Sequence, residues 1–85
     1  MIFLIEYDRH QGCLVNLKGF QETERLTAQN TRLQIELDLH RRGIQHEVVL
    51  LEAAGEEALR RTHRRYFEDL RQLTTSGSEA FTQIK

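Results

Sequence analysis

Apolar residues gather in three short segments of the chain, at residues 2–7, 13–17 and 44–51. Their length and their β-branched and aromatic content are typical of β-strands. The first two segments are separated by a polar stretch that begins with Asp8 and ends with Gly12. An aspartate that opens a turn and a glycine that closes it favour a hairpin loop with one left-handed residue. The pattern therefore predicts a β-hairpin, with its second strand ending at Gly19, and a third strand later in the chain.

Good helix formers fill residues 22–42, between the second and third predicted strands. Acidic residues stand in the first turn, and Arg41 and Arg42 stand in the last, where each charge complements the helix dipole. Gly43 follows, in the position of a left-handed C-terminal cap. We therefore expect a helix over residues 22–42.

A second helical segment begins after Gly55, with Glu56 and Glu57 in its first turn, and its apolar residues recur up to Leu73. Threonine, serine and glycine at residues 74–78 end it. The sequence predicts a single domain over residues 1–74. A C-terminal tail over residues 75–85 would hold either a short extra strand or a frayed end.

The predicted element order is β-β-α-β-α, which is an α+β fold. A helix between strands two and three calls for a right-handed crossover that leaves those strands parallel. We expect strand order 2-1-3, because it places the most apolar strand in the middle of an antiparallel or mixed sheet, with both helices packed on one face. This two-layer sandwich resembles a truncated or permuted ferredoxin-like fold. That resemblance is topological and implies no functional residue.

Composition narrows the picture to one folded domain. The chain has 85 residues, of which 39% are hydrophobic and 29% are charged, as is typical of one small folded domain. Its net charge of -1 argues against an electrostatic field that would attract nucleic acid or anionic lipid to the whole molecule. Cys13 has no internal disulfide partner, which favours a reducing compartment. The apolar run at residues 1–5 lacks a basic flank and is too short for a signal peptide or a membrane span. We expect a cytoplasmic protein without a membrane partner.

The first helix carries more apolar surface than one sheet can cover. Leu26, Leu33 and Leu37 share one stripe at helical spacing, and a second stripe lies nearly opposite, formed by Ala28, Ile35 and Leu39. The first and third strands are also apolar on both faces. A surplus apolar surface favours a two-fold homodimer, with Ala28, Ile35 and Leu39 as self-association candidates. Alternatively, the second helix or the tail covers this surface and a monomer suffices.

An arginine-rich segment in the second helix is the strongest local charge signal. The guanidinium group is a planar fork suited to phosphate or carboxylate, so the segment is a candidate for binding an anion, a nucleic-acid backbone or an acidic protein. The alternative is a solvated helix face, because acidic residues dilute the charge. The candidate residues are Arg60, Arg61, Arg64, Arg65 and Arg71.

His63 is predicted on the apolar face of this helix, one turn from Tyr66. The pair is a possible polar site for proton transfer, although a histidine in such a place is more often buried with its ring satisfied. The chain has no Gly-rich phosphate loop, no HExxH pair and no nucleophile elbow. We therefore predict no catalytic residue.

The histidines and the cysteine do not predict a metal centre. His10 and Cys13 stand three residues apart, but two ligands do not make a structural zinc site. His40 and His46 would complete a set only if the turn at Gly43 met the hairpin loop. We predict no metal and no cofactor.

The sequence thus predicts a small cytoplasmic protein that acts as a homo-oligomeric interaction or regulatory module. One alternative is nucleic-acid or anionic-ligand binding through the arginine-rich helix. Another is a small enzyme with its site at a dimer interface, around His63 and Tyr66.

Overall fold

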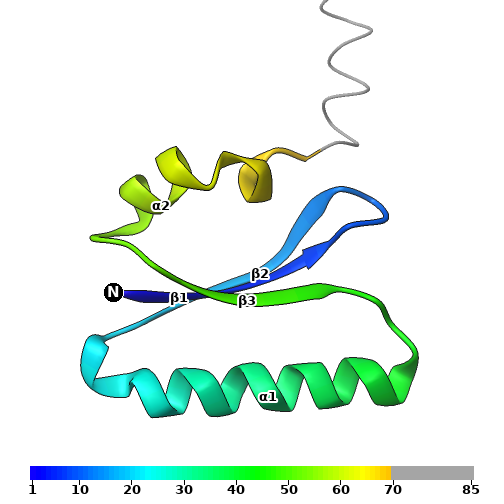
Figure 1. The fold of residues 1–85 in the computed structure, drawn as a ribbon. Coiled ribbons are helices and arrows are strands. Elements are labelled where there is room, and N and C mark those ends of the chain that lie inside the picture. The colour runs from blue at the N-terminus through cyan, green and yellow to red at the C-terminus, as the bar shows by residue number, and fades with distance from the viewer. Residues whose placement is uncertain (70–85) are drawn as a thin grey trace, which may run out of the picture.

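Three strands form an antiparallel sheet in the order β2-β1-β3 (Figure 1). The structure is a computed structural model, and it describes residues 1–69. The strands are β1 (Ile2–Asp8), β2 (Cys13–Phe20) and β3 (Glu47–Glu52). The predicted strand order is confirmed, as are the antiparallel pairing of β1 with both neighbours and the element order β-β-α-β-α.

The turn between β1 and β2 forms as its end residues predict. The Oδ1 atom of Asp8 accepts hydrogen bonds from the backbone N–H groups of His10 and Gln11, both at 3.0 Å. The N–H of Gly12 donates to the Asp8 carbonyl at 2.7 Å, and Gly12 has a left-handed φ of 69°. Only a residue that tolerates positive φ closes this loop without strain.

Two strand boundaries differ from the prediction. The chain stays extended through Gly19, which pairs with Phe3, so β2 ends at Phe20. At the other edge, β3 begins at Glu47, opposite Tyr7, and residues 44–46 form a loop. The Ile44 N–H caps the preceding helix, and this bond draws the start of the segment away from the sheet.

The long helix α1 (Arg25–Arg42) follows a 3₁₀ turn, η1 (Glu22–Glu24). Its C-terminus is capped by Gly43, with φ 68°, as the sequence predicts. The N–H of Gly43 donates to the His40 carbonyl at 3.1 Å, and the N–H of Ile44 donates to the Leu39 carbonyl at 2.9 Å. These two bonds are the pair that defines a Schellman cap.

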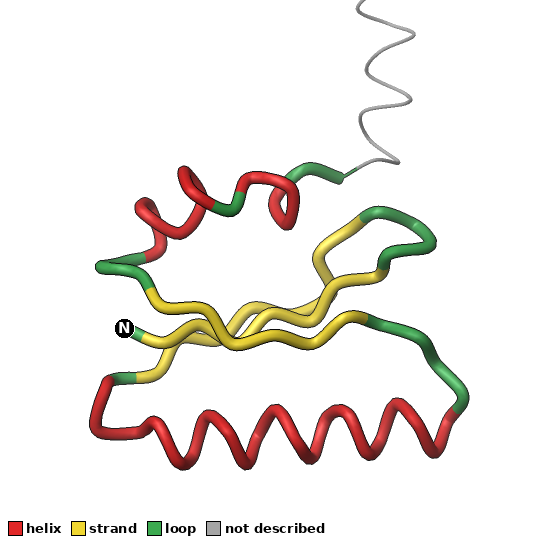
Figure 2. Tube along the Cα trace, viewed as in Figure 1, coloured by secondary structure: helices red, strands yellow, loops and turns green. Residues whose placement is uncertain are grey.

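The two helical segments lie on opposite faces of the sheet, so the prediction of a two-layer sandwich with both helices on one face is wrong (Figure 2). The helix α1 covers the face formed by Ile2, Leu4 and Phe20. The other face is covered by α2 (Glu56–Thr62) and a 3₁₀ turn, η2 (Arg64–Phe67). The physical reason is that β1 buries side chains on both faces, and each apolar face needs a cover.

The second helix is shorter than the sequence predicts. It ends at Thr62, because His63 leaves the helical region with φ −127° and ψ 54°. The Thr62 hydroxyl donates to the Ala58 carbonyl at 2.9 Å, a side-chain bond that competes with regular helix geometry. The predictions for residues 70–73, for the domain boundary at residue 74 and for the tail lie outside the described residues. No helix within residues 1–69 has the length and apolar character needed to cross a membrane.

Candidate functional site

The outer face of α1 presents a line of exposed leucines, which we call the leucine seam: Leu26, Leu33 and Leu37. Their side chains are 69%, 51% and 48% exposed, although all three are large and apolar. In Figure 1 this helix forms the outermost layer on its side of the sheet. Within residues 1–69, the other large apolar residues that are exposed are Met1 and Val15. The seam is therefore the main apolar surface that the described chain leaves open to water.

The stripe proposed for self-association lies inside the protomer, which corrects the sequence assignment. Ala28 is fully buried and Leu39 is 4% exposed. Ile35 is half-buried and packs against the cluster that α1 shares with the sheet. The small side chain of Ala28 lets the helix backbone approach the strands, whereas a leucine there would hold it away. Ala28, Ile35 and Leu39 are therefore core residues, and the surplus apolar stripe is the opposite one.

Charged residues lie along the exposed helix, beside the leucine seam. Arg32 pairs with Glu36 at 3.1 Å, and Arg42 pairs with Asp38 at 3.0 Å. All four side chains are about half exposed, so these pairs stabilise the helix only weakly. They surround the apolar line with polar groups, the arrangement usual at the edge of a reversible interface.

Three of the predicted arginines gather on the outer side of α2 and η2. Arg60, Arg61 and Arg64, together with Glu57, line a shallow hollow of about 450 Å³. Arg60 is held by Glu56, with the closest N–O distance at 2.7 Å, and its guanidinium lies 4.5 Å from the centre of the Phe67 ring. These three arginines share one surface, and both glutamates of the first turn stand beside it.

Arg65 does not belong to this surface. Its guanidinium lies 4.1 Å from the centre of the Tyr66 ring and donates to Glu47 on β3 at 2.8 Å. The break at His63 ends the regular helix on which the arginine-rich segment was predicted, and Arg65 is directed toward the sheet. Its role is to attach η2 to β3. Arg71 lies outside the described residues.

Tyr66 is buried, and its hydroxyl donates to Oε2 of Glu47 at 2.6 Å. This hydrogen bond, with the smaller help of Arg65, holds the pKa of Glu47 below its usual range. Burial, reinforced by the Glu47 carboxylate, raises the pKa of Tyr66. Tyr66 also packs edge-to-face on Tyr7, with ring centres 5.3 Å apart. The tyrosine hydroxyl is therefore part of the protein's own packing.

His63 and Tyr66 do not form a proton-transfer pair within the described structure. Their ring centres are 6.5 Å apart and tilted, and the Tyr66 hydroxyl is directed to Glu47. His63 is half-buried at the position where α2 ends. The geometry therefore gives no support to an enzyme site around these two residues.

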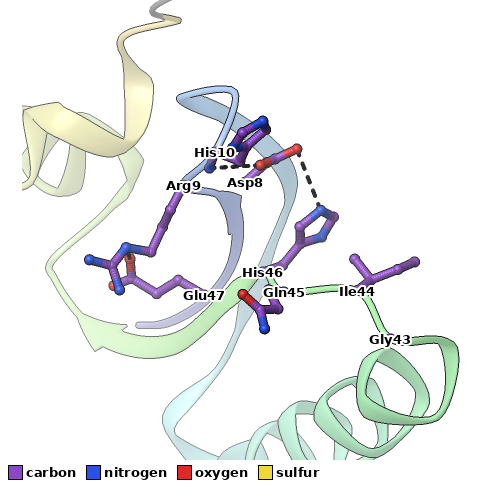
Figure 3. Close-up of a pocket in the computed structure, with 8 residues that line it drawn as sticks. All are labelled: Asp8, Arg9, His10, Gly43, Ile44, Gln45, His46 and Glu47. Carbon is purple, nitrogen blue, oxygen red and sulfur yellow. Dashed lines mark hydrogen bonds and ion pairs between the residues drawn. The ribbon is translucent and has the colours of Figure 1, made fainter.

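A second polar cluster, which the sequence did not predict, joins β1 to the residue just before β3, and Figure 3 shows its contact between His46 and Asp8. The Nδ1 atom of His46 lies 2.6 Å from Glu6, and its Nε2 atom lies 3.6 Å from Asp8. All three side chains are less than one-fifth exposed. Strand alternation places Glu6 and Asp8 on one face, but nothing local in the sequence indicates a partner 40 residues away.

The hollow beside His46 has a volume of about 870 Å³ and lies between the hairpin loop and the loop that follows α1. The hydrogen bond from the backbone N–H of Gln11 is the main interaction that lowers the pKa of Asp8. The nearby His46 lowers the same pKa by a smaller amount. The lining residues are Asp8, Arg9, His10, Gly43, Ile44, Gln45, His46 and Glu47.

The possible zinc set does not assemble in this structure. Cys13 is buried, whereas His10 and His40 are exposed. Within residues 1–69, no group of three or more histidine, cysteine or acidic side chains is arranged to hold a metal ion. His46 lies near the hairpin, as that idea required, but its ring is directed to the two carboxylates.

Comparison of the chain with protein-family models, with curated proteins and with solved structures finds no match in any of the three. The surfaces of the molecule are therefore the basis on which a function can be proposed.

Proposed function

We propose that this protein is a small interaction module that forms a reversible homodimer through the leucine seam. The observation that supports the proposal is the exposure of Leu26, Leu33 and Leu37 along one helix face, while both faces of the sheet are already covered. An apolar line of this kind, bordered by polar residues, is typical of a protein–protein contact. Two-fold pairing is the most common way for identical chains to cover such a surface.

The energy of this contact favours a weak dimer over a permanent one. Six leucines that are about half exposed would contribute on the order of 5–9 kcal/mol when buried in a dimer. Association costs roughly 4–15 kcal/mol in lost freedom of motion and side-chain ordering. The most favourable combination of these two terms leaves about 5 kcal/mol, so we expect a dissociation constant between about 0.2 mM and 1 mM. Such a dimer would form and separate with protein concentration, as suits a regulatory module.

Light scattering and sedimentation equilibrium between about 10 μM and 1 mM test the proposal. The 10.0 kDa chain should shift toward twice that mass as its concentration rises. The variant Leu33→Lys places a charge in the seam and should remain a monomer. Val15→Lys is the matched control, because Val15 is 48% exposed on β2 and Leu33 is 51% exposed on α1. A wild-type protein that stays monomeric at 1 mM, or a Leu33→Lys variant that still dimerises, would overturn the proposal.

A second candidate function, anion binding, is favoured by the hollow that Arg60, Arg61 and Arg64 line. Guanidinium groups on one surface suit a phosphate backbone or a carboxylate-rich partner. Glu57 in the same hollow weakens the local field, which makes this the second candidate.

Electrophoretic shift of a short duplex DNA at about 50 mM and 200 mM salt tests the phosphate-backbone form of this function, because backbone contacts weaken steeply with salt. The double variant Arg61→Ala/Arg64→Ala should lose binding. Arg9→Ala/Lys18→Ala removes the same charge elsewhere and should retain it. Equal loss in both double variants, or no binding at low salt, would exclude DNA-backbone binding at this surface.

A further inference from the structure

Resting on the proposed dimer, we infer that two copies of α1 pair antiparallel, with the two-fold axis between Thr31 and Arg32. In this arrangement Leu26 of one copy packs on the partner's Leu37, and Leu33 packs beside the partner's Asn30. The partner is thus a second copy of this chain, and the register of the contact is specified.

Spacing along α1 makes its outer face suitable for such a contact. The leucine seam continues through Asn30 and His40, so that positions 26, 30, 33, 37 and 40 alternate four-residue and three-residue steps. This alternation is the pattern by which one helix packs along another. At about 1.5 Å per residue, the 18 residues of α1 give a contact length of about 27 Å. Asn30 and His40 are exposed, as the seam requires.

The charges at the two ends of the helix favour the antiparallel direction. Glu22 and Glu24 lie in η1, immediately before the helix, where Arg25 pairs with Glu22 and Glu52, so carboxylates outnumber arginine at this end. His40, Arg41 and Arg42 form the last turn of the helix. Antiparallel pairing brings the acidic start of one copy toward the basic end of the other, and it also opposes the two helix dipoles. Parallel pairing would bring acidic ends together and basic ends together.

Two antiparallel registers each match four of the five seam positions of one copy with seam positions of the other. In the first, Leu26 lies opposite the partner's Leu37, so every leucine of the seam is inside the contact. The two Asn30 side chains then lie close together on either side of the axis. Each Asn30 faces the partner's Leu33 in this register, whereas the second register would place it opposite His40, so Asn30 does not select the first register, and the leucines and the charges decide between the two.

The second register shifts the axis to residue 35 and is less favourable for two reasons. It moves Leu26 past the end of the partner's α1, opposite the loop at Ile44. It also places Glu36 beside the partner's Glu36, a repulsion between like charges. In the first register Glu36 lies near the partner's Gln29, which is uncharged. The charges and the apolar residues therefore select the same alignment.

Cross-linking tests this register in a Cys13→Ala background, which removes the native thiol. Leu26→Cys and Leu37→Cys are prepared as separate proteins and treated with a short bis-maleimide, alone and mixed. Antiparallel pairing separates the two introduced thiols of a Leu26→Cys dimer by about 16 Å along the axis, and likewise those of a Leu37→Cys dimer. We expect efficient linkage in the mixture, between residue 26 of one copy and residue 37 of the other, and little linkage in either protein alone. Val15→Cys sets the level of random linkage.

Light scattering of the same single-cysteine proteins tests whether a dimer forms, independently of how its two helices are aligned. If they dimerise and Leu26→Cys links strongly to itself, the helices are parallel and this inference is wrong, although the dimer stands. If a mixture of Asn30→Cys and His40→Cys links and the first mixture does not, the second register is correct and ours is overturned. If the wild-type protein is monomeric up to 1 mM and linkage stays at the Val15→Cys level, the dimer itself is excluded.

Discussion

The hydrogen bond from Tyr66 to Glu47 connects η2 to the sheet through two single side chains. We expect Tyr66→Phe to lower the free energy of unfolding by about 1–3 kcal/mol, because the Glu47 carboxylate loses one of its two donors while the ring stays packed. Urea denaturation at pH 7 measures this change. Tyr7→Phe is the matched control, because the Tyr7 hydroxyl makes no hydrogen bond within residues 1–69. Similar losses in the two variants would contradict the assigned role of the bond.

Acid should weaken the protein at the same contact. The Tyr66 hydrogen bond, followed by the Arg65 contact, lowers the pKa of Glu47 in the folded protein, whereas the unfolded chain has the usual value of about 4.3. The carboxylate therefore adds stability above pH 4.3, and this contribution is lost as the pH falls through the lower folded value. Urea midpoints between pH 6 and about pH 3 should fall less in Glu47→Gln than in the wild type. An identical fall in both proteins would show that Glu47 is not responsible.

At the scale of elements, α2 has only seven residues, yet it covers the sheet face opposite α1. Leu59 is fully buried among Phe3, Ile5, Tyr7 and Tyr66. We expect Leu59→Ala to cost about 2–5 kcal/mol, the range for a cavity left by a buried leucine. Leu33→Ala on the exposed face of α1 should cost about 0.5 kcal/mol or less when measured on dilute monomer. If the two variants lost similar free energy of unfolding, Leu59 would not be a core residue between α2 and the sheet.

The strands could be predicted from the sequence, because each is a short apolar run rich in β-branched or aromatic residues. Phe3, Ile5 and Tyr7 do face one way, and Ile2 and Leu4 face the other. The orientation of α1 could not be predicted in the same way, because its two apolar stripes have similar strength. The decision between them depends on how closely the helix approaches the sheet at Ala28, which is a tertiary property.

The candidate surfaces were only partly predictable for a related reason. The arginines of the second helix share one side only if that helix is continuous, but the break at His63 separates Arg65 from Arg60 and Arg61. The cluster of His46 with Glu6 depends on strand register between distant parts of the chain. Periodicity within one segment carries no information about such a contact.

On the scale of the whole molecule, residues 1–69 form a three-strand sheet with one helical layer on each face, and none of these residues forms a second sheet or helix that covers α1. Within residues 1–69, α1 packs on β3 and β1, and its outer face meets solvent. A chain of this size gains little stability from its own core, since small domains bury a smaller fraction of their surface than large ones. Pairing of two copies would enlarge the buried apolar region without adding residues.

If the dimer forms, the stability of the protein should depend on its concentration. Binding between folded copies favours the folded state, and once the dimer dominates, each tenfold rise in concentration adds up to about 1.4 kcal/mol per dimer. The urea midpoint of the wild-type protein should therefore stay constant at low concentration and rise above the dissociation constant. The urea midpoint of Leu33→Lys should stay constant between about 10 μM and 1 mM. Association would bury the lysine ammonium at the seam, and burying an unpaired charge is unfavourable. Val15→Lys should follow the wild type. A midpoint that rises equally in Leu33→Lys would mean that any association uses a surface other than the leucine seam.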